Sequence, residues 1–259
     1  MNIADREELS TEFILFHPEK VVHLAAQAGV RYSIENPYAY LDANLTGFIN
    51  ILELCRHNGV EGLTYASSSS VYGANNKIPF STGDKTDRPI ALYGATKKAN
   101  ELMAHAYSHL YGLHTTGLRY FTVYGPWGRP DMAMFIFTDK ILKDKTIPVY
   151  NHGNMKRDFT YIDDIIAGTR SAMEKNYSCE VFNLGNHKSE NLMDMIGIIE
   201  NSLGIKAKID FQPKQPGDVP ESYADIDKST EMLSYIPTTD INEGIPRFTT
   251  WYKDYHNPH

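Results

Sequence analysis

Short runs of apolar residues alternate along the chain with longer segments in which apolar residues recur every three or four positions. Short runs are typical of strands that a parallel sheet buries on both faces, and the longer segments are typical of helices with one apolar side. We expect strands at 21–26, 63–67, 115–122, 157–162 and 180–184. We expect helices at 5–17, 37–58, 93–111, 134–144 and 241–255, one between a Ser189 cap and Gly204, and one opened by Asp163 and Asp164. This alternation predicts an α/β protein with a doubly wound parallel sheet.

The pattern becomes looser after Pro126, and 205–227 alternates short strands with loops that contain proline and glycine. Neither an internal repeat nor a low-complexity linker divides the sequence. We therefore expect a second, smaller α/β lobe that packs against the first. The expected division places 1–125 and 163–184 in the first lobe, and 126–162 and 185–259 in the second.

Composition excludes several classes of protein. The 259 residues are 42% hydrophobic, which is enough to bury a sizeable core. A net charge of −7 without a long basic run argues against nucleic acid and membrane surfaces as partners. Cys55 and Cys179 do not form a disulfide framework pattern, and no apolar run approaches the ~18 residues of a membrane span, so we expect a cytoplasmic protein. No acid near His105 and His109 completes a zinc motif, so we expect no metal.

The start of the helix at 93–111 carries candidate chemistry. Tyr93 and Lys97 lie four residues apart, so their side chains leave from one face of the helix. A phenol titrates near ~10 in water, and an ammonium beside it favours the phenolate and lowers that pKa. Ser68 ends an expected strand, and its hydroxyl can hydrogen-bond the same substrate oxygen. Tyr93 is therefore a candidate general base.

Longer motifs carry a family resemblance. The segments VHLAA (22–26), SSSSVYG (67–73), YxxxK (93–97) and LRYFTVYGP (118–126) resemble those of extended short-chain dehydrogenases/reductases that act on nucleotide sugars. Within that family, QAGVRYS (27–33), GRPDMA (128–133) and QPGDVP (215–220) are most similar to UDP-glucuronate 4-epimerases. The resemblance covers nearly the whole chain.

This resemblance implies a Rossmann-like sheet that binds NAD, a smaller lobe that binds a UDP-sugar, and a homodimer. It implies that Ser68, Tyr93 and Lys97 are catalytic: Tyr93 takes the proton of the sugar 4-hydroxyl while the C4 hydride passes to NAD and later returns to the other face of a 4-keto sugar. The residues implied to contact NAD are Leu24, Ala25, Ala26, Asn44, Ala66, Ser67, Tyr93, Lys97 and Tyr120. Those implied to contact substrate are Arg31, Ser69, Ser70, Thr122, Arg129, Arg157 and Asp218.

The two residues after Ser68 bear on the type of reaction. Related dehydratases carry an Asp-Glu pair there, and related UDP-glucuronate decarboxylases carry a glutamate in that stretch, whereas this chain has Ser69 and Ser70. Without that acid an elimination lacks its proton donor, and an epimerisation needs none. We therefore expect epimerisation at C4 of UDP-glucuronate to give UDP-galacturonate. A UDP-glucuronate decarboxylase, another nucleotide-sugar epimerase or dehydratase, and a non-catalytic sugar-nucleotide-binding fragment are the alternatives.

The sequence departs from the family in its first part. It has no glycine-rich turn after a first strand, where backbone N–H groups face the dinucleotide pyrophosphate. Relative to the family, the chain is expected to begin at the third helix and to lack three strands and two helices. The strand at 21–26 would then form an exposed edge with apolar faces. We expect this chain by itself to bind NAD poorly and to be a weak catalyst.

Overall fold

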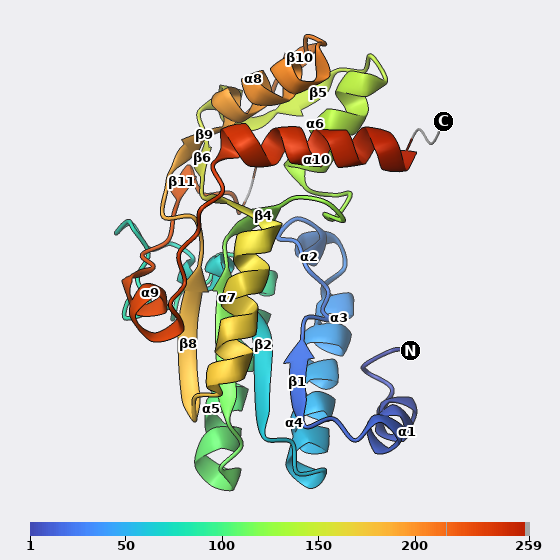
Figure 1. Cartoon of the computed structure of the whole chain (residues 1–259), viewed down its shortest axis with the longest axis vertical. Coiled ribbons are helices and arrows are strands. Elements are labelled where there is room, and N and C mark those ends of the chain that lie inside the picture. Colours follow the sequence, from blue (N-terminus) through green and yellow to red (C-terminus); the bar gives the residue numbers. More distant parts are fainter. Residues whose placement is uncertain (216, 257–259) are drawn as a thin grey trace.

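The computed structural model describes residues 1–215 and 217–256. Its main sheet has four parallel strands in the order β1-β2-β3-β8 (Figure 1). Their bounds are Lys20–His23 (β1), Gly62–Ser68 (β2), Thr115–Tyr120 (β3) and Cys179–Leu184 (β8). Residues 216 and 257–259, which belong to the expected second lobe, lie outside the described part of the chain.

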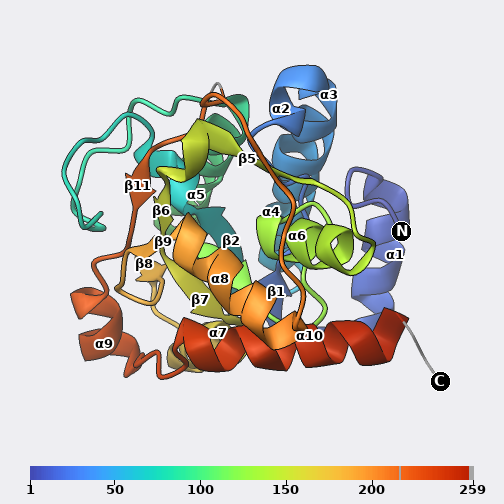
Figure 2. The ribbon, with the colours of Figure 1, turned by 90° about the horizontal axis from the view of Figure 1, so that it is seen from above.

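Helices cover both faces of this sheet (Figures 1 and 2). One face carries α1 (Arg6–Phe16), α4 (Gly47–His57) and α5 (Leu92–Tyr111), and the other carries α7 (Ile162–Lys175) and α9 (Asp227–Leu233). Tyr65 of β2 is buried in the apolar cluster on the first face, whereas Leu118 of β3 is buried in the cluster on the second. Because successive strand residues point to opposite faces, one sheet serves two cores. The expected doubly wound parallel sheet is therefore present.

A second layer of short strands and helices lies beyond the carboxyl ends of the main strands (Figure 1). It contains the pairs β4-β7 and β5-β10 and the three-stranded sheet β11-β6-β9. The strands are β4 (Thr122–Tyr124), β5 (Ile147–Val149), β6 (Lys156–Arg157), β7 (Phe159–Tyr161), β9 (Glu190–Asn191), β10 (Ile209–Phe211) and β11 (Glu221–Ser222). The helices are α6 (Ala133–Leu142), α8 (Leu192–Leu203) and α10 (Ile241–His256). Phe159, Ile199 and Phe248 are buried together between these elements.

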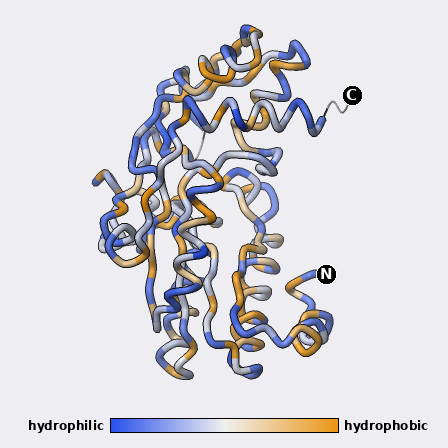
Figure 3. Tube along the Cα trace, viewed as in Figure 1, coloured by the Kyte–Doolittle hydropathy of each residue, from blue (hydrophilic) through white to orange (hydrophobic). Residues whose placement is uncertain are grey.

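The segment expected as one helix over 37–58 contains three pieces, α3 (Pro37–Tyr40), a π-helical stretch η1 (Leu41–Thr46) and α4. The short helices α2 (Tyr32–Glu35), η2 (Ser69–Tyr72) and η3 (Tyr150–Gly153) complete the elements. Apolar and polar positions alternate along the helices in the trace of Figure 3, as one-sided packing requires. Within residues 1–215 and 217–256, no helix combines the length and apolar character needed to cross a bilayer.

The first strand is shorter than the expected 21–26. It ends at His23, and β2 is its one neighbour among the described residues. Val22 is 39% exposed and Leu24 is 51% exposed, so burial on both faces was the wrong expectation for this strand. The expectation of an edge with exposed apolar residues is confirmed.

Two expected strands are each divided by a change of hydrogen-bonding partner. The backbone N–H of Phe121 donates to Leu184 of β8, but the next N–H, that of Thr122, donates to Asp158, so 115–122 passes from the main sheet into the β4-β7 pair. Asp158 also interrupts 157–162, where β6 and β7 belong to different sheets. Its carboxylate is fully buried and accepts hydrogen bonds from three backbone N–H groups, including that of Asn186 at 2.5 Å. These contacts involve residues distant in sequence, which apolar patterning does not reveal.

Two expected helix caps are wrong. Helix α7 begins at Ile162 without a side-chain cap, and Asp163 and Asp164 lie inside its first turn. The Asp164 carboxylate instead accepts the backbone N–H of Thr238 at 3.1 Å. Ser189 lies two residues too early to cap α8, and its hydroxyl donates to Glu221 at 2.6 Å. Asp164 therefore ties the start of α7 to a later loop, and Ser189 ties the segment before α8 to strand β11.

Candidate active site

The candidate catalytic residues meet at the carboxyl end of the main sheet. Strand β2 ends at Ser68 and η2 begins at Ser69, so the serine loop (67–70) spans the junction between them. Tyr93 lies in the first turn of α5. The carboxyl edge of a parallel sheet is where open α/β folds place their ligands, because the loops after the strands converge there. Ser68 and Tyr93 therefore lie at the edge where such sheets bind their ligands.

Two glycines let the segment around η2 pack closely against α5 and against the residues just before it. Gly73 has a φ of +56°, and a Cβ there would overlap the carbonyl oxygen of Arg88. A Cβ on Gly94 would lie 2.5 Å from the carbonyl oxygen of Ser70. Only residues without a Cβ fit such a close approach. The first turn of α5 therefore packs directly on η2, and Tyr93 faces Ser68.

The protonation of Tyr93 differs from the expectation. Burial raises the pKa of its phenol above the ordinary value, and this effect exceeds the lowering by the Ser68 hydroxyl and by the charge of Arg129. Lys97 was expected to lower the pKa of Tyr93, and that expectation is wrong. Its ammonium donates instead to the carbonyl oxygen of Ala66 at 2.9 Å. The cation that favours the phenolate comes from the loop after β4.

Lys97 is a buried cation with spare hydrogen-bonding capacity. Its side chain is nearly inaccessible, and none of the acidic residues in the described ranges forms an ion pair with it. Burial lowers the pKa of Lys97 to about 8. His23, at the end of β1, has a pKa lowered to about 4 by its own burial and by the charge of Lys97. At neutral pH the site therefore holds a charged Lys97, with two free N–H donors, beside a neutral imidazole.

Besides Tyr93 and Lys97, the residues expected to contact NAD fall into two groups. Leu24, Ala25 and Ala26 follow β1, and Ala66 lies at the end of β2 beside Lys97, so all four border the same edge of the sheet as Tyr93. The other three make hydrogen bonds within the protein. Asn44 is buried and bonds the backbone of Gln27 and the hydroxyl of Thr96, Ser67 donates to Glu101 at 2.7 Å, and Tyr120 bonds Thr169.

Asn44 owes its position to the π-helical stretch. Its side-chain oxygen accepts the N–H of Gln27 at 2.9 Å, and its side-chain nitrogen donates to the Gln27 carbonyl and to Thr96, both at 3.0 Å. Its own carbonyl accepts from Asn100 at 2.6 Å. A π-bulge re-aims side chains within a helix and is frequent at functional sites. Asn44 thus joins the loop after β1 to helix α5 and fixes both at the sheet edge.

Three of the expected substrate residues form a charged cluster. Arg31 lies 3.5 Å from Asp218 and stacks over the ring of Tyr150 at 4.8 Å. Burial lowers the pKa of Arg157, the charge of Asp218 raises it and the charge of Arg31 lowers it, which places the three side chains within electrostatic range. Two guanidinium groups and one carboxylate leave one net positive charge. Such a cluster suits a phosphate, which arginine binds with its planar fork.

The remaining expected substrate residues lie nearer to Tyr93. Ser69 and Ser70 form the start of η2, and the backbone N–H of Ser70 donates to the Ser68 hydroxyl at 3.1 Å. Thr122 begins β4. Arg129 forms a bidentate pair with Asp131 at 2.9 and 2.8 Å, and its charge reaches Tyr93. Ser68 and Arg129 are thus the two groups from these segments that act on the Tyr93 phenol.

Sequence reasoning did not identify Tyr40. This residue is fully buried, and its hydroxyl donates to the carbonyl oxygen of Gly29 at 2.5 Å. The Tyr40 ring lies edge-on to the ring of Tyr93, with 6.1 Å between their centroids. Tyr40 therefore supports both Tyr93 and the loop that carries Arg31. No local pattern marks it, because its partners lie in other segments of the chain.

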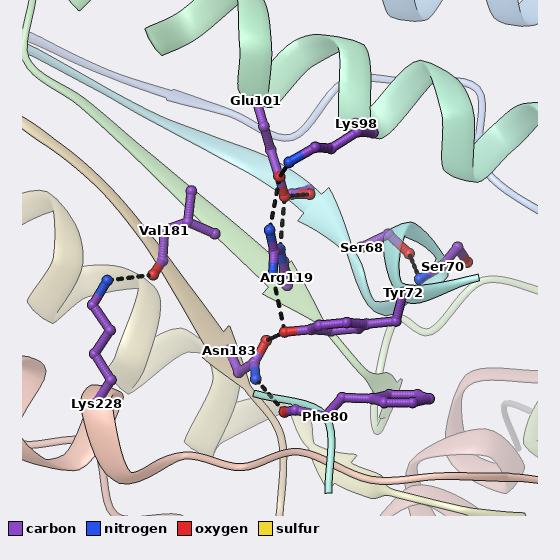
Figure 4. A network of polar contacts seen from close by, with 11 residues as sticks. Ser68, Ser70, Tyr72, Phe80, Lys98, Glu101, Arg119, Val181, Asn183 and Lys228 are labelled. Atoms are coloured by element: carbon purple, nitrogen blue, oxygen red, sulfur yellow. Dashed lines mark hydrogen bonds and ion pairs between the residues drawn. The ribbon is translucent and has the colours of Figure 1, made fainter. Parts of the chain in front are cut away.

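A buried polar network behind the site was also not expected (Figure 4). Glu101, two helical turns after Tyr93, accepts hydrogen bonds from Nε and Nη2 of Arg119 at 2.8 and 2.9 Å. Arg119 also donates to the hydroxyl of Tyr72 at 3.0 Å, and that hydroxyl donates to Asn183 at 2.6 Å. The network joins α5 to β3, η2 and β8. It fixes the helix that carries Tyr93 against the strand ends.

Comparison with known proteins decides the family. The model of the NAD-dependent epimerase/dehydratase family matches residues 1–185. The chain belongs to this family. The expected resemblance and the Rossmann-type α/β class are confirmed, and the family's cofactor is NAD.

Family members are similar over almost all of this chain. Protein CapI of Staphylococcus aureus is 51% identical over 274 residues, which cover 99% of this chain and 82% of CapI. UDP-glucuronate 4-epimerase 4 of Arabidopsis thaliana is 48% identical over 274 residues, covering 99% of this chain and 63% of the plant protein. The crystal structure of UDP-glucuronic acid 4-epimerase from Bacillus cereus, in complex with UDP-glucuronic acid and NAD, superposes with a TM-score of 0.92 at 34% identity. That match covers 99% of this chain and 81% of the Bacillus chain.

Proposed function

We propose that this protein catalyses the NAD-dependent epimerisation of UDP-glucuronate to UDP-galacturonate at C4. The observation that carries the proposal is the meeting of Ser68, Tyr93 and Lys97 at one edge of the sheet, together with the cluster of Arg31 and Arg157; Lys97 is buried and forms no ion pair within residues 1–215 and 217–256. The relatives that carry the name UDP-glucuronate 4-epimerase support the reaction type and the sugar. The expected activity, NAD-dependent isomerisation of a sugar nucleotide, thus agrees with both the site and the family.

The residues present fit the nicotinamide half of NAD. Among the described residues, Lys97 donates only to the Ala66 carbonyl and meets no carboxylate, and a buried ammonium in that state favours a ligand with hydroxyl groups. Lys97 and Tyr93 would hold this half of the cofactor, with Leu24, Ala25 and Ala66 beside it. When bound, NAD supplies reversible hydride transfer at the sugar C4. No residue of this sequence is assigned to the pyrophosphate, because the sequence has no glycine-rich turn after β1.

The protein's own residues move the proton. Tyr93, ionised as the phenolate, takes the proton of the sugar 4-hydroxyl, and the phenol so formed returns it after the sugar has turned over. The Ser68 hydroxyl, which faces Tyr93, hydrogen-bonds the same sugar oxygen and holds it in line. Burial opposes ionisation of Tyr93, and Ser68 and Arg129 are the groups that favour it. Lys97, with a pKa of about 8, is protonated at neutral pH and adds positive charge at the sheet edge.

The arrangement of charges orients the substrate. Arg31, Arg157 and Asp218 would bind the diphosphate and ribose, and Arg129 would bind the uronate carboxylate on the Tyr93 side. Ser69 and Ser70 offer no carboxylic acid next to Ser68. An elimination would need such a proton donor, so the site favours epimerisation.

The lobes and the assembly follow from the same proposal. Residues 1–125 and 163–184 form the dinucleotide-binding part, and 126–162 with 185–259 form the sugar-nucleotide lobe. We propose a homodimer through α4 and α5, because Leu102 and Leu110 of α5 are 60% and 65% exposed. Both Cys55 and Cys179 are free thiols, which agrees with a cytoplasmic location. Light scattering tests the dimer, and a monomer at micromolar concentration would contradict it.

The experiment that tests the function is a product analysis. The protein is incubated with UDP-glucuronate and saturating NAD, and the nucleotide sugars are separated by anion exchange and identified by NMR. UDP-galacturonate is the expected product, formed slowly because the sequence has no glycine-rich turn for the dinucleotide pyrophosphate. Release of carbon dioxide with a UDP-pentose would identify a decarboxylase instead. Binding of UDP-glucuronate without any conversion would identify a non-catalytic protein.

A further inference from the structure

The turn between β4 and α6 has an unusual residue at its third position. The N–H of Gly128 donates to the carbonyl oxygen of Gly125 at 3.1 Å, and Trp127, the third residue of this turn, has a φ of +62°. A positive φ at this position is that of a type II turn, which glycine or asparagine normally fills. A bulky side chain in this region is a genuine outlier, so some other interaction must hold Trp127 there.

Burial does not supply that interaction. The Trp127 side chain is 72% exposed. Its ring instead contacts two aromatic rings of helix α10: its centroid lies 5.4 Å from that of Trp251 and 4.9 Å from that of Tyr255. Trp251 and Tyr255 stack on each other, with 16° between their planes. Trp127 meets Tyr255 edge-on, with 71° between the ring planes, and edge-on and stacked geometries are favourable for aromatic pairs.

Helix α10 is a firm support for this contact. Phe248 and Tyr252, which neighbour Trp251 on the helix surface, are 1% and 3% exposed, and the Tyr252 hydroxyl donates to Asp139 of α6 at 2.7 Å. The turn itself leads directly into the loop of Arg129 and Asp131, whose bidentate pair faces the loop at Gly29. Trp127 therefore stands between a rigid helix and a loop that borders Tyr93.

We propose that Trp127 is a positioning residue: its contacts with Trp251 and Tyr255 fasten the segment 125–132 to helix α10 and thereby set where Arg129 meets the substrate. This inference rests on the proposed function, because it assigns Arg129 to the uronate carboxylate. It explains why a strained, exposed tryptophan stands where glycine would fit. It also gives α10, distant from Tyr93 in sequence, a part in substrate binding.

The test compares variants that separate backbone strain from ring contact. Trp127→Ala removes the ring and keeps the backbone strain, whereas Trp127→Gly removes the ring and relieves the strain. We therefore expect the melting temperature of Trp127→Gly to be no lower than that of the wild type. In both variants we expect hydrogen exchange across 125–132, measured by mass spectrometry, to accelerate about tenfold, since two aromatic pairs are lost. We expect the Kd for UDP-glucuronate and the KM to rise about tenfold, with kcat within about twofold. Trp127→Phe and Trp251→Phe keep an aromatic ring at the contact. Their exchange rates and their Kd for UDP-glucuronate should therefore lie closer to those of the wild type than to those of Trp127→Ala.

Ile236→Ala is the matched control, because Ile236 is 68% exposed and lies outside the aromatic contacts. Wild-type exchange across 125–132 in Trp127→Gly, or an equal acceleration in Ile236→Ala, would overturn the proposal. Faster exchange with an unchanged Kd for UDP-glucuronate would also overturn it, since the turn would then not position the ligand. If the wild type itself fails to bind UDP-glucuronate, the proposed function is wrong, and the exchange measurement alone decides whether Trp127 fastens the turn.

Discussion

Replacement of Glu101 tests the network that holds the catalytic helix. Glu101→Gln keeps the shape of the side chain but removes its charge, while Arg119 stays buried with 4% of its side chain exposed. Glu101 accepts two hydrogen bonds from Arg119 and one from Ser67, so the variant also turns one acceptor into a donor. Removing one member of a buried ion pair destabilises a protein by about 3–5 kcal/mol. Total stabilities are about 5–15 kcal/mol, so a large part of the folding free energy is at stake.

The pKa of Glu101 gives the same interaction a pH signature. Burial alone would raise the pKa of this carboxyl, but the hydrogen bonds and charge of Arg119 outweigh burial and hold it below the usual range. A depressed folded-state pKa adds stability that is complete above the unfolded value of about 4.3 and is lost as pH falls through the folded value. The free-energy difference between the wild type and Glu101→Gln should therefore shrink at acid pH.

The assay is urea unfolding at pH 7 and at acid pH, followed by circular dichroism. Lys98→Met is the matched control: Lys98 contacts the same carboxylate at 3.0 Å but is 26% exposed, so its removal should change stability by less than about 1 kcal/mol. Arg119→Met and the double variant complete a cycle, in which the pair should be strongly non-additive. A loss below about 1 kcal/mol in Glu101→Gln, or additive losses, would refute the reasoning.

Three other variants or conditions test the site. Ser68→Ala should lower kcat by about 10²–10⁴-fold with the KM little changed, because its hydroxyl acts on the reacting oxygen; equal rates would exclude that role. The rate should fall as pH rises through about 8, where Lys97 loses its proton, and Lys97→Arg should move this limb upward; a limb unmoved by the variant would assign it to another group. Gly94→Ala places a Cβ 2.5 Å from the Ser70 carbonyl oxygen, so thermal unfolding should show a destabilisation of about 1–3 kcal/mol. Ala95→Gly changes the neighbouring, exposed position, and its loss of stability should not exceed about 1 kcal/mol.

The fold was predictable where local patterns decide it. Apolar runs located the four main strands, and helical spacing located helices α5 and α10. These elements show such patterns because each of them packs apolar side chains against a neighbouring element. The divisions at Phe121 and Asp158 were not predictable, since they depend on hydrogen bonds between segments distant in sequence. Likewise Asp163 and Asp164 follow a capping pattern, but Asp164 binds a loop more than seventy positions later.

The site shows the same limit. The spacing of Tyr93 and Lys97 predicted that both side chains leave one face of α5, but it did not show that Lys97 donates to the Ala66 carbonyl. That contact depends on how closely α5 approaches β2, which the glycine contacts and the Glu101–Arg119 pair determine. Tyr40 had no local signal at all. Motifs therefore locate the reacting groups, and packing decides which of them touch.

We propose that Tyr93 moves the proton of the sugar 4-hydroxyl while the hydrogen on C4 is never released to water. The most direct test follows UDP-glucuronate deuterated at C4 by NMR, with the wild type and with Tyr93→Phe, at saturating NAD. The account predicts UDP-galacturonate that retains deuterium at C4 with the wild type, and almost no conversion with Tyr93→Phe, which should still bind UDP-glucuronate. Conversion by Tyr93→Phe at the wild-type rate, or loss of the deuterium to solvent, would contradict it.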